Sequence, residues 1–109
     1  TAALQMLHEG VRPSAIFAAN DAVAIGAMEA LLLQGLKIPQ RVSVVGFGNI
    51  PLAGYCQVPL TTVRQPKRAL GAAAMDLMLR LLRGEPVISA LLPAELVIRA
   101  SSGPPSTDA

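Results

Sequence analysis

Two asparagines stand directly after apolar segments, where a polar side chain contributes little to a core. Asn20 follows the small apolar run 15–19, and Asn49 follows the segment "RVSVVGFG" at 41–48. An asparagine amide offers both a donor and an acceptor, which suits the hydroxyl groups of a small ligand. A local role is equally compatible with the residues, in which Asn20 bonds to the turn and Asp21 caps a following helix. Both interpretations stay open at this point.

Other reactive residue types are sparse. The chain has one histidine, His8, and one cysteine, Cys56, so no internal disulfide can form; with no carboxylate cluster either, the sequence shows no metal-ligand spacing. The serines from Ser43 onward have no general base near them in sequence. The segment "GFGN" lacks the later glycine and the lysine of a phosphate-binding loop. The sequence therefore predicts no enzyme, no metal and no cofactor.

Composition limits the remaining classes of function. The 109 residues are 52% hydrophobic and only 15% charged, which predicts that some apolar surface meets another chain or another part of the same protein. The net charge of +2 comes from scattered residues, without the basic cluster that binds nucleic acid. A lone cysteine fits a reduced thiol in the cytoplasm, and no apolar run is long enough to cross a membrane. Because no initial methionine is present, the chain is expected to begin within a longer protein.

Glycines and prolines divide the chain regularly into helices and strands. The expected order is helix, strand, helix, strand, irregular segment, helix and strand, which predicts an open, mostly parallel α/β sheet with flanking helices. The expected helices end at Gly10, Gly35 and Gly84, and Asp21 is the expected cap of the second helix. Ligands of such sheets bind at the carboxyl ends of the strands, where Asn20 and Asn49 are expected to lie.

Several segments together resemble one protein family. "AIFAANDAVAIGAMEALLLQGLKIPQRVSVVGFGN", followed by "VPLTTVRQP" and "LPAELVIRAS", is similar to the C-terminal part of the effector domain in LacI/GalR transcriptional regulators. The resemblance covers residues from about 13 to 102. It implies an incomplete type I periplasmic-binding-protein-like fold. It also implies a homodimer that contacts operator DNA through a helix-turn-helix headpiece, which this chain does not contain.

The resemblance assigns three effector-binding positions, namely Asn20, Gly48 and Gln65. Asn20 matches the family's "AND" asparagine, whereas Gly48 stands where the family has an aspartate that binds sugar hydroxyls. Asn49 is a candidate substitute for that aspartate. The missing carboxylate removes repulsion against a negative ligand. A sugar acid or a phosphorylated compound is therefore expected as a candidate effector, beside a neutral sugar.

The resemblance also divides the chain. Residues 1–99 are expected to form the C-terminal part of the effector domain, with 66–84 as a helix that crosses to the other lobe, and 100–109 as a flexible tail. Ile25, Tyr55 and Cys56 match positions of the dimer interface. The predicted function is effector sensing and dimerisation in a cytoplasmic transcriptional regulator. The alternative is a periplasmic sugar-binding protein of the same fold.

Overall fold

The computed structural model describes residues 2–107, which separate into two compact units. The first unit contains residues 2–64 together with 96–107, and the second contains residues 65–95. Each unit is described below by itself.

A short parallel sheet forms the centre of the first unit. β1 (Ala15–Phe17) pairs with β2 (Ser43–Val45) in parallel, with Ile16 opposite Val44. An isolated parallel bridge joins Val45 to Thr61, just before β3 (Thr62–Arg64). The expected parallel sheet is therefore confirmed, with β2 between β1 and the start of β3. β3 also pairs with β4 (Glu95–Val97).

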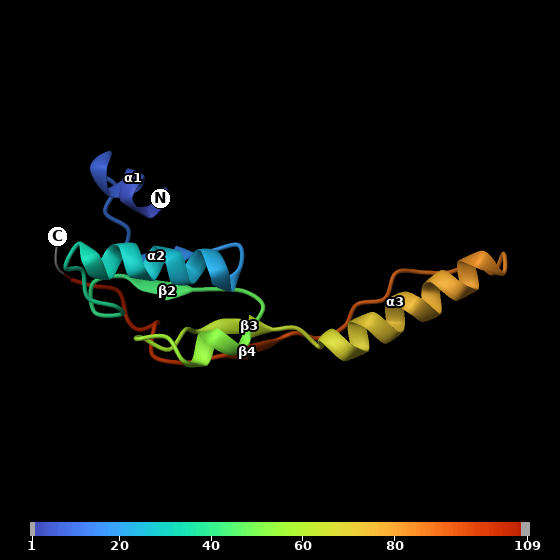
Figure 1. Ribbon diagram of the computed structural model, residues 1–109. Helices are drawn as coiled ribbons and strands as arrows, with labels where there is room; N and C mark the ends of the chain where they lie inside the picture. Colours follow the sequence, from blue (N-terminus) through green and yellow to red (C-terminus); the bar gives the residue numbers. More distant parts are fainter. Residues whose placement is uncertain (1, 108–109) are drawn as a thin grey trace. The chain divides into compact units, whose positions relative to one another are not determined.

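One helix contributes Ala24, Met28 and Leu31 to the core beside this sheet. α2 (Asp21–Leu33) lies along β2 (Figure 1). Asp21, Ala24, Met28 and Leu31 are buried and recur three or four residues apart, which places them on one helical face. That face packs against β2 and the segments beside it; the core comprises Ala18, Ala24, Met28, Leu31, Ile38, Val42, Val44, Ala53 and Leu60. The short helix α1 (Ala2–His8) contacts α2, and the 3-10 helix η1 (Pro51–Gly54) interrupts the loop after β2.

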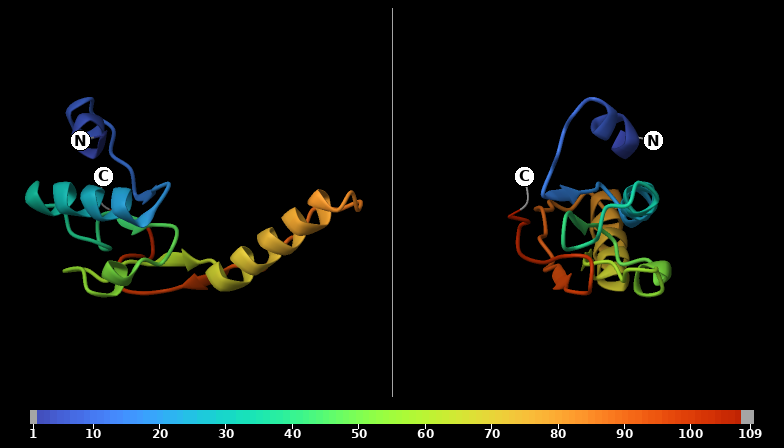
Figure 2. Two further views of the ribbon diagram at one scale, coloured as in Figure 1. Left: turned by 45° about the vertical axis from the view of Figure 1, so that its right-hand side comes forward. Right: turned by 90° about the vertical axis from the view of Figure 1, so that its left-hand side faces the viewer.

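The segment after β4 is part of this core rather than a free extension. Figure 2 shows it in red, running back from β4 towards β2. Ser101 is fully buried, and its carbonyl accepts from the Val44 N–H at 2.8 Å. Its hydroxyl donates to the Val44 carbonyl and accepts from the Thr61 N–H. Residues 101–103 are thus tied to the sheet, which differs from the flexible tail predicted from residue 100.

The second unit consists of α3 (Lys67–Leu82) and the chain that returns from it. No residue of α3 is buried. The apolar face predicted at Leu70, Ala74, Leu77 and Leu81 has no core to cover within the unit, and Leu81 is 53% exposed. Among the described residues, no helix is long and apolar enough to cross a membrane.

Candidate functional site

The carboxyl ends of β1, β2 and β3 meet at one edge of the first unit. The Asp21 N–H donates to the Phe47 carbonyl at 3.1 Å, which joins the segment after β1 to the segment after β2. The Gly48 N–H donates to the Val63 carbonyl at 2.8 Å, which joins the second segment to β3. Asn20 and Gly48, predicted separately from the sequence, therefore follow strands whose ends are held side by side.

Asn20, and not Asp21, caps α2. Asn20 has an extended backbone, with φ of −154°, and its side-chain oxygen accepts from the Val23 N–H at 2.9 Å. The predicted capping role of Asp21 is wrong, because Asp21 is already the first helical residue. Since capping uses the oxygen of the exposed Asn20 amide, the group left for a ligand is its Nδ2 donor.

Asp21 is instead a buried junction between the three strand ends. Its side chain is 1% exposed, and it accepts from the Thr62 hydroxyl at 2.6 Å and from the Ile50 N–H at 2.8 Å. A Cβ added to Gly46 would collide with the Asp21 carboxylate, so the glycine makes this close packing possible. Both carboxylate oxygens are engaged within the protein, and Asp21 is not available to an effector.

Gly48 leaves open space at the end of β2. Its φ of +126° lies in a region that residues with a side chain rarely adopt, and a Cβ built there would meet nothing within 4 Å. The site thus has room where the family resemblance places an aspartate.

The side chain of Asn49 is bonded to another residue of the protein, Arg99. Its side-chain oxygen accepts from Arg99 Nη2 at 2.8 Å, and its backbone has φ of 56°. Arg99 also donates from Nη1 to the Leu60 carbonyl at 2.9 Å. The acceptor that Asn49 was expected to offer a ligand is therefore occupied by Arg99.

Two of these roles, those of Thr62 and Arg99, were missed from the sequence. Each side chain bonds a residue far away along the chain, and no local pattern marks such a partner. Gln65, the third predicted effector contact, is the first residue of the second unit, so its contact with an effector stays a prediction.

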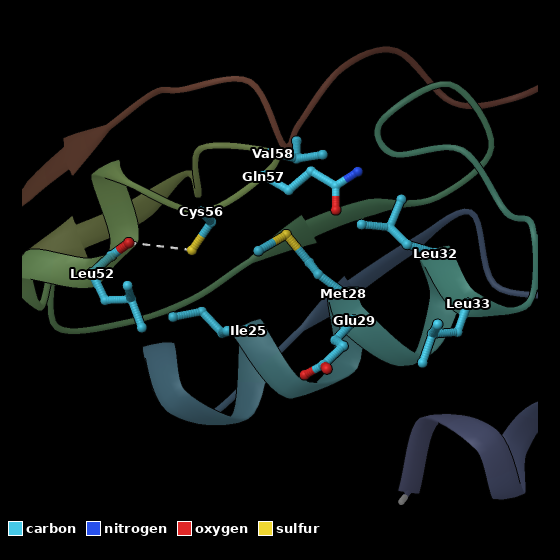
Figure 3. A pocket seen from close by; sticks show the side chains of 9 residues that line it. All are labelled: Ile25, Met28, Glu29, Leu32, Leu33, Leu52, Cys56, Gln57 and Val58. Carbon is cyan, nitrogen blue, oxygen red and sulfur yellow. Dashed lines mark hydrogen bonds between the residues drawn. The ribbon is translucent and has the colours of Figure 1, made fainter.

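An apolar groove lies beside α2, away from the strand ends. Its volume is about 560 Å³, and Figure 3 shows Leu52 and Cys56 facing Ile25 and Met28 across it. The residues that line it are Ile25, Met28, Glu29, Leu32, Leu33, Leu52, Cys56, Gln57 and Val58. Two of the predicted interface residues, Ile25 and Cys56, thus share one groove, whereas Tyr55 points outwards and is 85% exposed.

The environment of Cys56 disfavours its thiolate. Burial raises the pKa of the Cys56 thiol, the negative charge of Asp21 raises it further, and the positive charge of Arg99 opposes both. The thiol donates to the Leu52 carbonyl at 3.2 Å. Across residues 2–107, no group of three histidine, cysteine or acidic side chains could hold a metal ion.

Comparison with known proteins shows which kind of domain contains this site. Residues 1–102 match the model of the periplasmic binding protein-like domain. The transcriptional repressor CytR of Escherichia coli K12 is 41% identical over 100 residues, which are 90% of this chain and 29% of the repressor. The lactose operon repressor of Rhizobium radiobacter is 42% identical over 105 residues, which are 95% of this chain and 93% of that sequence.

Solved structures of lac repressors are also similar to this chain. A lac repressor dimer bound to operator and the anti-inducer ONPF aligns with a TM-score of 0.85 at 39% identity. That alignment covers 93% of this chain and 36% of the repressor chain. The chain spans about 29% of the length of CytR and of the lactose operon repressor of Escherichia coli K12.

Proposed function

Because this chain belongs to the LacI/GalR family of transcriptional regulators, within their periplasmic-binding-protein-like domain, we propose that it is the effector-sensing and dimerisation part of such a regulator. The observation that carries the proposal is the backbone bond between Asp21 and Phe47, which brings Asn20 and Gly48 to one edge. Ligands of open α/β sheets bind at that edge. The whole regulator would contact operator DNA as a homodimer, through a headpiece outside this chain, and would act in the cytoplasm where that DNA lies.

The polar groups at this edge favour an acidic effector. The oxygen of Asn20 is used in capping, the oxygen of Asn49 is bonded to Arg99, and the carboxylate of Asp21 is buried. The Asn20 amide thus offers a ligand its hydrogen-bond donor, and Gly48 leaves space without a negative charge. A carboxylate or phosphate accepts such bonds more strongly than a hydroxyl does. We therefore propose a sugar acid or a phosphorylated sugar as the effector, with a neutral sugar as the alternative.

The alternative function is that of a periplasmic sugar-binding protein with the same fold. The relatives support regulation instead, since they are named as transcriptional repressors. Sequence upstream of this chain would distinguish the two functions, because a helix-turn-helix indicates a regulator and a signal peptide indicates a periplasmic protein.

The proposal is tested by thermal unfolding of the complete protein in the presence of neutral sugars, sugar acids and sugar phosphates. A true effector at one hundred times its Kd stabilises the protein by about 2.7 kcal/mol. The same compound should change the affinity for operator DNA. If no compound of these classes stabilises the protein or changes operator binding, the effector-sensing role is wrong.

A further inference from the structure

Two asparagine amides belong to the same edge of the first unit. Asn20 directly precedes Asp21, and Asn49 directly precedes Ile50. The Ile50 N–H donates to the Asp21 carboxylate at 2.8 Å, so the residues that follow the two asparagines are bonded to each other. An amide can turn either its oxygen or its NH2 group towards a ligand, and the partner that it has within the protein decides which group is left.

In both amides the atom that bonds within the protein is the oxygen. The partner of the Asn20 oxygen is the Val23 N–H at 2.9 Å, and the partner of the Asn49 oxygen is Nη2 of Arg99 at 2.8 Å. A backbone N–H and a guanidinium can only donate, so neither partner would accept an amide that is turned round. The two NH2 groups are therefore the groups that these side chains leave for a ligand.

The backbone around Asn49 is held by bonds of its own. The Gly48 N–H donates to the Val63 carbonyl at 2.8 Å. The Asn49 N–H donates to the Thr62 hydroxyl oxygen at 3.4 Å, and the Ile50 N–H is bonded as described above. Because these three successive backbone donors are used within the protein, the Asn49 side chain is the polar group through which this segment can contact an effector. Its φ of 56° is one that asparagine adopts more readily than most residues.

Arg99 fixes the orientation of the Asn49 amide. Its Nη1 donates to the Leu60 carbonyl at 2.9 Å, and its backbone N–H donates to the Thr61 hydroxyl oxygen at 3.0 Å. Arg99 is thus fastened to the segment that leads into β3 at two points. Because the guanidinium is a rigid planar fork, these bonds also set the position of the Nη2 that holds Asn49.

We propose that Arg99 determines effector specificity by holding the oxygen of Asn49, so that the NH2 group of this amide donates to a carboxylate or phosphate of the effector. This inference rests on the proposed effector-sensing function and adds a second donor to that of Asn20. Two donors whose own acceptor oxygens are already bonded favour an anion over a hydroxyl group. Arg99 is a positioning residue here, because it acts through Asn49.

Isothermal titration calorimetry of the complete protein tests the proposal with two pairs of probes, D-glucuronate with D-glucose and D-galacturonate with D-galactose. Asn49→Asp keeps the shape of the side chain and an oxygen for Arg99, but it replaces the NH2 group with a second oxygen. Affinity for the acids should fall about tenfold or more, whereas affinity for the neutral sugars should not fall. Thermal unfolding should show no loss of stability, because Arg99 now bonds a carboxylate. A purely structural role of Asn49 would leave the preference between acid and neutral sugar unchanged.

Two further variants separate the amide from the positive charge of Arg99. Asn49→Gly suits the positive φ, removes the amide and leaves the charge in place, whereas Arg99→Met removes the charge and releases the amide. Both should lose the preference for acids, and the double variant should lose no more than the worse single variant. If Asn49→Gly keeps the preference and Arg99→Met loses it, the charge acts directly and the proposal is wrong. Should Arg99→Met not fold by circular dichroism, the two Asn49 variants still decide.

The wild-type protein distinguishes failure of this inference from failure of the proposed function. A wild type that prefers the acids, with Asn49 variants that keep this preference, overturns the inference alone. A wild type that prefers the neutral sugars overturns the inference and the acidic effector, but leaves effector sensing intact. If none of the four probes binds, the inference is also overturned, and effector sensing is decided by the thermal-unfolding screen and by operator binding.

Discussion

The Thr62 hydroxyl donates to Asp21 at 2.6 Å, between two fully buried side chains that are 41 residues apart in the sequence. With the bond from the Ile50 N–H to the same carboxylate, this contact fastens the start of α2 to β3 and to the loop after β2. The edge that is proposed to bind the effector therefore depends on a residue whose carboxylate is bonded within the protein. Asp21 is a positioning residue in this arrangement.

Replacing Asp21 tests that role. Asp21→Ala leaves the Thr62 hydroxyl and the Ile50 N–H buried without a partner, at a cost of roughly 1–3 kcal/mol for each. Urea unfolding of the complete protein should show this loss. Asp21→Asn retains one acceptor oxygen and should lose less. A change below about 0.5 kcal/mol for Asp21→Ala would contradict the buried junction.

Variants of Asn20 separate its capping role from its predicted effector contact. Asn20→Ala removes both and should lower stability by about 0.5–2 kcal/mol, with effector affinity falling about tenfold or more. Asn20→Asp keeps a capping oxygen but removes the amide donor, so stability should hold while binding of an acidic effector is lost. Calorimetry on both variants checks this. Unchanged affinity in Asn20→Asp would exclude Asn20 as a donor to the effector.

Gly48→Asp restores the carboxylate that the family resemblance places at this position. The space is open, so the side chain fits, but the positive φ imposes strain of about 1–3 kcal/mol. Effector preference should shift from acids towards neutral sugars. Gly48→Ala controls for strain, because it adds a side chain without charge. If Gly48→Asp and Gly48→Ala have the same preference in calorimetry, charge at this position does not select the effector.

The reactivity of Cys56 should depend on pH in a predictable direction. Burial and the charge of Asp21 raise the pKa of the Cys56 thiol. At a given pH, a smaller fraction of Cys56 than of free cysteine is therefore present as the reactive thiolate. Alkylation by iodoacetamide should be slower than for free cysteine at pH 8, and the two rates should converge as the pH rises through both pKa values. An apparent pKa from the pH profile that is equal to or lower than that of free cysteine would contradict the raised pKa of the Cys56 thiol.

The exposed apolar surface of α3 predicts that the isolated 109-residue chain self-associates. α3 has no buried residue, and its exposed apolar side chains include Met75, Met78 and Leu82. Burying a large aliphatic side chain contributes roughly 1.5–3 kcal/mol, so this surface favours association. Light scattering should show self-association. A compact monomer of 11.3 kDa that unfolds cooperatively would contradict this prediction and weaken the expectation that residues 66–84 form a helix that crosses to the other lobe.

The sequence predicted the elements well because their signals are local. Gly10, Gly35 and Gly84 end the three helices as expected, and each has a positive φ. The alternation of strands and helices gave the parallel sheet and brought Asn20 and Gly48 to one edge. Local signals could not tell which of two adjacent polar residues caps α2. That choice is made by Thr62 and Ile50, which draw Asp21 into the core and leave the capping position to Asn20.

The bonds of Ser101 also impose an order on biosynthesis. Its hydroxyl bonds to Val44 and Thr61, which precede it by 57 and 40 residues. On the ribosome, both strands are complete long before residue 101 has been added, and contacts of such large sequence separation are the slow ones in folding. Until translation has passed through the whole of the second unit, three backbone groups at the centre of the first unit, the Val44 N–H and carbonyl and the Thr61 N–H, therefore lack their final partner.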